Sequence, residues 1–79
     1  MKDLVEYIAK TLVEHPDDVK VREVRTERTV MIELTVNPDE KGKVIGRDGK
    51  IARAIRALVS MSAQREGKRG ILEILLASR

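Results

Sequence analysis

Apolar residues recur at helical spacing in the first segment of the chain, between residues 3 and 15. The apolar positions on this face are Leu4, Val5, Ile8, Ala9 and Leu12. Charged residues occupy the other side, and this pattern predicts an amphipathic helix. Pro16 disfavours helical geometry at His15, so we expect the helix to end there and a turn to follow.

Two strand patterns come next. The first has valines between charged residues, at Val19, Val21 and Val24. The second alternates strictly from Val30 to Val36, which predicts that one face of this strand is buried. The polar link over residues 26–28 suits a hairpin, so we expect the two strands to be antiparallel.

The following segment predicts two consecutive helices. Asn37 or Asp39 can cap a short helix that runs to Ile45 and stops at Gly46. A longer helix follows from residue 48 or residue 50. Its predicted inner stripe consists of Ile51, Ile55, Leu58, Val59 and Ser62.

A polar loop over residues 65–70 precedes a final apolar strand over residues 71–76. The predicted order is therefore helix, strand, strand, helix, helix, strand. Because a two-helix crossover joins the second and third strands, these strands should be parallel, with a right-handed connection. We expect an α+β fold with one domain over residues 1–79, a three-stranded mixed sheet and three helices packed on one face.

The composition narrows the possible functions. The chain has 79 residues and no cysteine, which leaves room for one domain and excludes disulfides and thiolate metal sites. Tyr7 is the one aromatic residue, so binding of single strands by aromatic stacking is excluded. The N-terminal segment lacks the apolar run of a signal peptide, and no apolar stretch is long enough to span a membrane. We expect a cytoplasmic protein with no membrane partner.

No combination of residues in the sequence indicates catalysis. His15 is the one histidine, and we interpret it as a residue at a helix C-terminus, where it favours the dipole. Asp17 and Asp18 fit a solvated turn. Ser60 and Ser62 have neither a base nor a nucleophile elbow near them in sequence. We therefore expect no enzymatic activity, no cofactor and no metal.

Positive charge gathers around two glycines, Gly46 and Gly49. Residues 41–56 hold six basic residues and one acidic residue, a net charge of +5, whereas the whole chain carries +3. The spacing of the glycines alone says little, because Gly67 and Gly70 repeat it. The charge around the first pair is what calls for an explanation.

Two interpretations of this turn are possible. In the structural one, Gly46 ends one helix in a left-handed conformation and Asp48 caps the next helix. In the functional one, amides at the positive end of the second helix bind an anion, and the glycines let a sugar–phosphate chain approach closely. Lys43, Arg47 and Lys50 lie near the same place in sequence. Because a structural corner does not need this charge, the sequence favours the functional interpretation.

Residues 44–55 carry a family resemblance. An apolar pair, Gly-x-x-Gly and a helix with spaced aliphatic residues resemble the core motif of KH domains. The predicted order of elements resembles the bacterial type II KH arrangement. Residues 4–10, the turn at residues 15–17 and the strand over residues 32–36 are similar to the small single-domain bacterial RNA-binding proteins of the KhpA family.

This resemblance implies that the turn clamps about four nucleotides of single-stranded RNA or DNA. The RNA-binding residues that it implies are Lys43, Ile45, Gly46, Arg47, Asp48, Gly49, Lys50, Ile51 and Arg53. Lys43, Arg47 and Lys50 would neutralise phosphates. The two isoleucines and the strand over residues 30–36 would border the groove that receives the bases. The loop over residues 65–70 takes the place of the family's variable loop and could add contacts.

The resemblance further implies a non-enzymatic post-transcriptional regulator or RNA chaperone. One KH domain reads few bases, so useful affinity needs a second domain. The family resemblance implies a homodimer, or a heterodimer with a second KH-domain protein of the Jag type. The alternatives are a protein-interaction module that keeps the KH scaffold and a binder of single-stranded DNA. The carboxylate of Asp48 would repel phosphate, unless it turns back to cap the helix.

Overall fold

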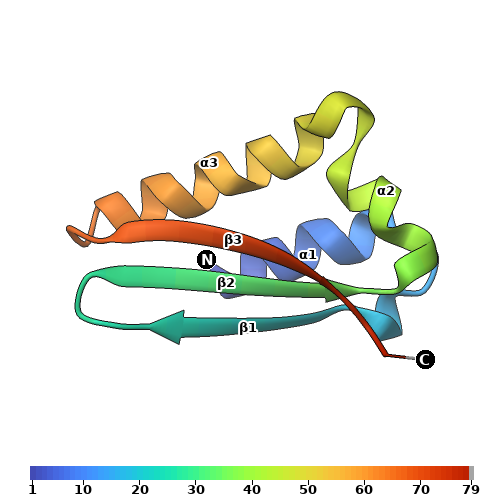
Figure 1. Ribbon diagram of the computed structural model, residues 1–79, viewed down its shortest axis with the longest axis horizontal. Helices are drawn as coiled ribbons and strands as arrows, with labels where there is room; N and C mark the ends of the chain where they lie inside the picture. Colours follow the sequence, from blue (N-terminus) through green and yellow to red (C-terminus); the bar gives the residue numbers. More distant parts are fainter. Residues whose placement is uncertain (79) are drawn as a thin grey trace.

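A three-stranded sheet covered by helices on one face makes up the protein (Figure 1). The computed structural model describes residues 1–78. The helices are α1 (Lys2–Leu12), α2 (Lys41–Ile45) and α3 (Lys50–Gln64), and the strands are β1 (Lys20–Arg25), β2 (Thr29–Val36) and β3 (Arg69–Leu76). The connections include single 3-10 turns, which are η1 (Pro16–Asp18), η2 (Pro38–Glu40) and η3 (Arg47–Gly49). The order of helices and strands confirms the predicted one.

The strand order in the sheet is β1–β2–β3, with β2 in the centre. β1 pairs with β2 in antiparallel fashion, with Glu23 opposite Ile32. β3 pairs with β2 in parallel, with Leu72 opposite Ile32. The mixed sheet agrees with the prediction, because the crossover through α2 and α3 returns the chain in the direction of β2.

The core lies between the helices and one face of the sheet. Residues of β2 alternate between buried and half-buried along the whole strand, as the apolar alternation predicted. The buried side chains that meet in this core are Val5, Ala9, Val19, Val30, Ile32, Leu34, Val36, Val44, Ile55, Val59, Ala63 and Leu72. All three helices contribute to the same cluster, so they cover the same face of the sheet.

The first helix is shorter than predicted. It ends at Leu12, and Val13 already has an extended backbone with φ −105° and ψ 161°. The half-buried side chain of Val13 packs against the core, so the chain leaves the helix before Pro16 has any effect. The interpretation of His15 as a helix C-terminal residue is therefore wrong.

The buried face of α3 combines two alanines with two larger aliphatic residues. The buried residues of this helix are Ala52, Ile55, Val59 and Ala63. Leu58 and Ser62, which were predicted to lie in the inner stripe, are only half-buried. The helix lies so close to β3 that a Cβ built on Gly70 would be 2.6 Å from the carbonyl oxygen of Val59. The prediction differs from the structure because it assigned Leu58 to the buried face of the helix and left out Ala52 and Ala63.

β3 begins at Arg69, two residues before its predicted start. The amide of Arg69 donates a hydrogen bond of 2.8 Å to the carbonyl oxygen of Arg28, and Gly70 pairs with Val30. The last two residues of the predicted loop therefore belong to the sheet. Strand pairing with β2 recruits them although their own side chains carry no apolar signal.

Candidate nucleic-acid interface

The Gly46–Gly49 segment is a tight turn between α2 and α3. Gly46 has φ 79° and ψ 171°, and the next three residues form one 3-10 turn. Asp48 and Gly49 both have left-handed backbone, with φ 56° and φ 74°. The amide of Gly49 donates to the carbonyl oxygen of Gly46 at 3.1 Å and closes the turn. Aspartate is one of the few residues that tolerate this conformation.

Both glycines of the turn have a role in the fold itself. A Cβ on Gly46 would lie 2.6 Å from Cγ1 of Ile51, so this isoleucine packs directly on the backbone of the turn. A Cβ on Gly49 would lie 3.4 Å from Nη1 of Arg53, which places that guanidinium group beside the turn. The structure thus brings Gly46, Ile51, Gly49 and Arg53 together as expected. The structural interpretation was also correct in one respect, since the fold needs glycine at position 46.

Asp48 does not cap α3. The N-cap residue of this helix is Gly49, and no side chain forms a cap hydrogen bond there. The side chain of Asp48 is exposed at the turn. Asp48 lies one residue before the N-cap position of α3. Its negative charge therefore stays on the surface beside Arg47.

Arg47, Lys50 and Arg53 surround the turn with positive charge. All three are exposed, and none takes part in an ion pair within residues 1–78. In the same part of the chain, the amides of Arg47 and Asp48 form no backbone–backbone hydrogen bond. The turn also lies at the N-terminal, positive end of the 15-residue helix α3. An anion at this place would meet positively charged side chains, backbone amides and the positive end of the helix dipole.

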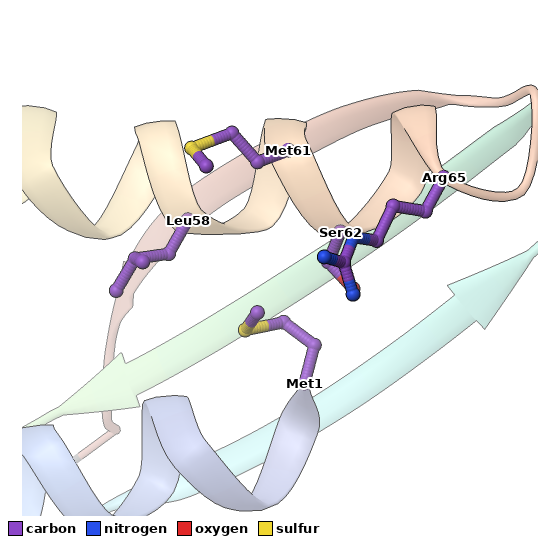
Figure 2. Close-up of a pocket in the computed structure, with 5 residues that line it drawn as sticks. All are labelled: Met1, Leu58, Met61, Ser62 and Arg65. Atoms are coloured by element: carbon purple, nitrogen blue, oxygen red, sulfur yellow. The ribbon is translucent and has the colours of Figure 1, made fainter.

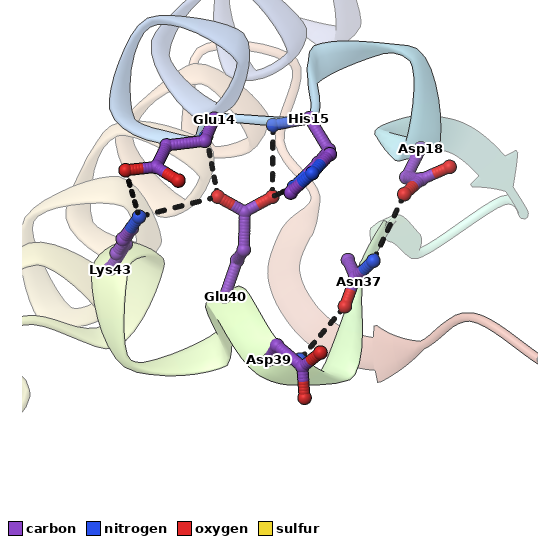
Figure 3. Close-up of polar contacts among 7 residues, drawn as sticks. All are labelled: Glu14, His15, Asp18, Asn37, Asp39, Glu40 and Lys43. Atoms are coloured by element: carbon purple, nitrogen blue, oxygen red, sulfur yellow. Dashed lines mark hydrogen bonds and ion pairs between the residues drawn. The ribbon is translucent and has the colours of Figure 1, made fainter.

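Lys43 lies in a different environment from the other basic residues. Its Nζ is 3.4 Å from a carboxylate oxygen of Glu14 and 3.5 Å from Oε2 of Glu40 (Figure 3). Two carboxylates therefore offset the charge of this lysine. The expectation that Lys43 neutralises phosphate has no support in this geometry.

The carboxylate of Glu40 is the centre of a polar cluster that the sequence analysis missed. Its side chain is buried, and it accepts hydrogen bonds from the amides of Glu14 and His15, the latter at 3.0 Å. Nδ1 of His15 lies 2.9 Å from Oε1 of the same carboxylate (Figure 3). Nothing in the sequence pattern distinguishes Glu40 from its acidic neighbour Asp39. Its role follows from the tertiary contact between two loops.

Burial raises the pKa of Glu40, but the hydrogen bonds from the amides of Glu14 and His15 and from the His15 ring outweigh that effect. The net result is a pKa of about 2, below the ordinary value of 4.5. A carboxyl group whose pKa is lower in the folded state stabilises the fold when it is ionised. The contribution of Glu40 is therefore present above about pH 5 and is lost as the pH falls towards about 2.

This pKa shift predicts a pH-dependent difference between the parent and Glu40→Gln. We expect the variant to have a lower free energy of unfolding at pH 7, measured by urea denaturation. The difference should shrink steadily between about pH 5 and pH 2, because the parent carboxylate becomes protonated in that window. A difference that stays constant down to pH 2 would show that the ionised form of Glu40 does not stabilise the fold.

The strand that was expected to border the groove for bases lies in the centre of the sheet. Residues 30–36 were expected to border the groove for bases, but the inward-facing side chains of β2 are at most 4% exposed, at Val30, Ile32, Leu34 and Val36. β2 is the central strand, so β1 and β3 flank it on both sides. The strand that runs beside α3 at the sheet edge is β3 (Figure 1), with a half-buried Ile74 and an exposed Leu76. Ile45 and Ile51 are half-buried.

The residues of the loop after α3 contact the β1–β2 hairpin. Glu66 forms an ion pair with Arg25, and Nζ of Lys68 donates to the carbonyl oxygen of Thr26 at 2.9 Å. This loop follows the C-terminal end of α3, whereas the glycine turn precedes its N-terminal end. A 15-residue helix is about 22 Å long, so a contact from both places would need an extended ligand.

A shallow pocket lies between the start of α1 and the C-terminal half of α3 (Figure 2). It is lined by Met1, Leu58, Met61, Ser62 and Arg65. None of the predicted RNA-binding residues contributes to it. Within residues 1–78, no group of three or more acidic or histidine side chains could hold a metal ion. In the same range, no helix has the length and apolar character that crossing a bilayer requires.

Comparison with known proteins finds relatives over nearly the whole chain. The family model "KhpA/KhpB, KH domain" matches residues 2–74. A Clostridium perfringens protein named "RNA-binding protein KhpA" is 51% identical over 75 residues, covering 95% of this chain and 100% of the relative. A protein of the same name from Aquifex aeolicus is 52% identical over 75 residues, covering 95% of each chain. No solved structure gives a significant match.

Proposed function

The chain belongs to the KhpA/KhpB KH-domain family, and on that premise we propose that it binds short single-stranded RNA through the Gly46–Gly49 turn. The family membership confirms the resemblance seen in the motifs, and the family consists of RNA-binding proteins and not of enzymes. The observation that carries the proposal is the group of exposed cations without ion-pair partners within residues 1–78, namely Arg47, Lys50 and Arg53.

The backbone of the RNA would lie against the turn. Phosphates would meet the side chains of Arg47, Lys50 and Arg53, and the amides near the start of α3 would add hydrogen bonds. Bases would lie along the half-buried side chains of Ile45 and Ile51. Because aliphatic side chains form no hydrogen bonds to the edges of the bases, we expect weak preference for base identity.

Asp48 would moderate the affinity of this site. Its exposed carboxylate stands within the turn and repels phosphate, whereas the three neighbouring cations attract it. Screening by salt reduces both effects at this exposed position. We expect a net attraction, since the positive charges outnumber the negative one.

A single domain of this kind offers few contacts, so we propose that it acts together with a second KH domain. The second domain would be another copy of this chain or a larger KH protein of the Jag type, and joint binding would raise affinity through avidity. In this role the protein would act as a post-transcriptional regulator or an RNA chaperone. The rival proposals are a protein-interaction module that keeps the KH scaffold and a binder of single-stranded DNA.

Competition between nucleic acids tests the proposed function. A labelled single-stranded RNA of about eight nucleotides should be displaced by unlabelled RNA of the same sequence at least tenfold better than by a duplex RNA. Single-stranded DNA of the same sequence serves as the third competitor, and equal displacement by DNA would favour the DNA-binding alternative. If no nucleic acid binds, the interaction module is the better account. Sedimentation of the same samples shows whether one or two copies occupy each RNA.

A further inference from the structure

The buried carboxylate of Glu40 connects the segment after α1 to the short helix that leads into the glycine turn (Figure 3). This side chain is 4% exposed. Its hydrogen-bond donors come from two places in the sequence, residues 14–15 and Lys43. One carboxylate thus fixes the distance and the orientation between these two segments.

α2 depends on this contact because it has few other anchors. The helix has five residues, and its one fully buried side chain is Val44. A single apolar contact does not determine the rotation of a short helix, whereas directional hydrogen bonds at its first turn do. The amide of Gly46 bonds to the carbonyl oxygen of Gly42, so the glycine turn follows the orientation of α2.

Lys43 completes the cluster as a counter-ion. Its Nζ lies between the carboxylates of Glu14 and Glu40, at 3.4 and 3.5 Å. A phosphate at this lysine would have to approach two negative charges. The cations at the turn have no such neighbours in ion-pair contact within residues 1–78.

We infer that Glu40 is a positioning residue for the glycine turn and that Lys43 serves as its counter-ion and not as a phosphate ligand. This inference rests on the proposed function of the turn and deepens it. It assigns the phosphate contacts to Arg47, Lys50 and Arg53. It also makes the fit of the turn to RNA depend on a contact outside the Gly-x-x-Gly motif.

The role of Lys43 is tested by the salt dependence of RNA binding. For single-stranded RNA, each neutralised phosphate adds about 0.7 to the steepness of the log–log plot of affinity against salt. We expect Lys43→Met to keep the slope of the parent, whereas Lys50→Met, the matched control, should make it shallower by about 0.7. An equal loss of slope in both variants would overturn the assignment of Lys43.

The role of Glu40 is tested by comparing the turn with the whole fold. In Glu40→Gln, the hydrogen-bonded amides of Gly46, Gly49 and Lys50 should exchange hydrogen faster than the loss of global stability explains. RNA affinity should fall about fivefold or more with an unchanged salt slope, because the variant changes the position of the turn and removes no cation that contacts phosphate. The core variant Ile55→Val, expected to lose about 1 kcal/mol of stability, serves as the control and should keep its RNA affinity.

Two outcomes would overturn the positioning role of Glu40. One is unchanged or higher RNA affinity in Glu40→Gln, which would mean that the carboxylate only withholds Lys43 from RNA. The other is unchanged hydrogen exchange in the turn. The exchange measurement needs no RNA, so it separates a failure of this inference from a failure of RNA binding itself.

Discussion

Replacing Arg47 with aspartate should weaken RNA binding by about 30-fold or more. The substitution removes a charged hydrogen bond to phosphate worth about 2 kcal/mol and places a second carboxylate beside Asp48. The side chain of Arg47 is exposed and forms no ion pair within residues 1–78, so the fold should lose less than about 0.5 kcal/mol. Fluorescence anisotropy with a short labelled RNA measures the affinity, and thermal unfolding measures the stability.

The control for this variant is Arg28→Asp. Arg28 is exposed in the β1–β2 hairpin, and the substitution makes the same change in net charge. Its effect on RNA affinity should be at most about threefold, because salt screens charges that are far from the ligand. Equal losses in the two variants would show that net charge, and not the turn, determines binding.

Replacing Gly70 with alanine should destabilise the protein by about 3 kcal/mol. A Cβ at this position would lie 2.6 Å from the carbonyl oxygen of Val59 and 2.8 Å from Cα of Ser60. These atoms belong to the backbone of α3, so the helix itself must move away from β3. A domain of this length has a total stability of roughly 4–12 kcal/mol, and the loss would be a large part of it.

Gly42→Ala is the matched control for Gly70→Ala. A Cβ on Gly42 would meet no atom within 4 Å, and the residue lies inside α2. The same chemical change should therefore stabilise the protein by about 0.5 to 1 kcal/mol. Urea denaturation of both variants gives the two free energies of unfolding. If Gly70→Ala is as stable as the parent, then α3 and β3 do not pack as closely as described.

Much of the fold could be predicted from apolar periodicity. The strict alternation from Val30 to Val36 identified the central strand, and the two glycines with the helical pattern after them identified the crossover. The errors occurred where tertiary contacts override local pattern. Val13 leaves α1 to enter the core, and pairing with β2 draws Arg69 and Gly70 into β3.

The candidate site was only partly predictable, for a physical reason. The motif located the turn and the exposed cations, because these lie close together in the sequence. It gave no information on Lys43, since the two carboxylates that offset its charge include Glu14, which is far from it along the chain. The buried carboxylate of Glu40 likewise accepts hydrogen bonds from the amides of residues 14–15, which are far from it along the chain. No local sequence pattern encodes such a contact.

The central claim is that three cations around the glycine turn bind the phosphates of single-stranded RNA. The most direct test is the affinity of the parent and of Arg47→Asp for one short RNA across a series of salt concentrations. We predict a log–log slope of about −2 for the parent, as three phosphate contacts require, and a slope shallower by about 0.7 for the variant. An affinity of the parent that does not change with salt, or equal slopes for both proteins, would contradict the account.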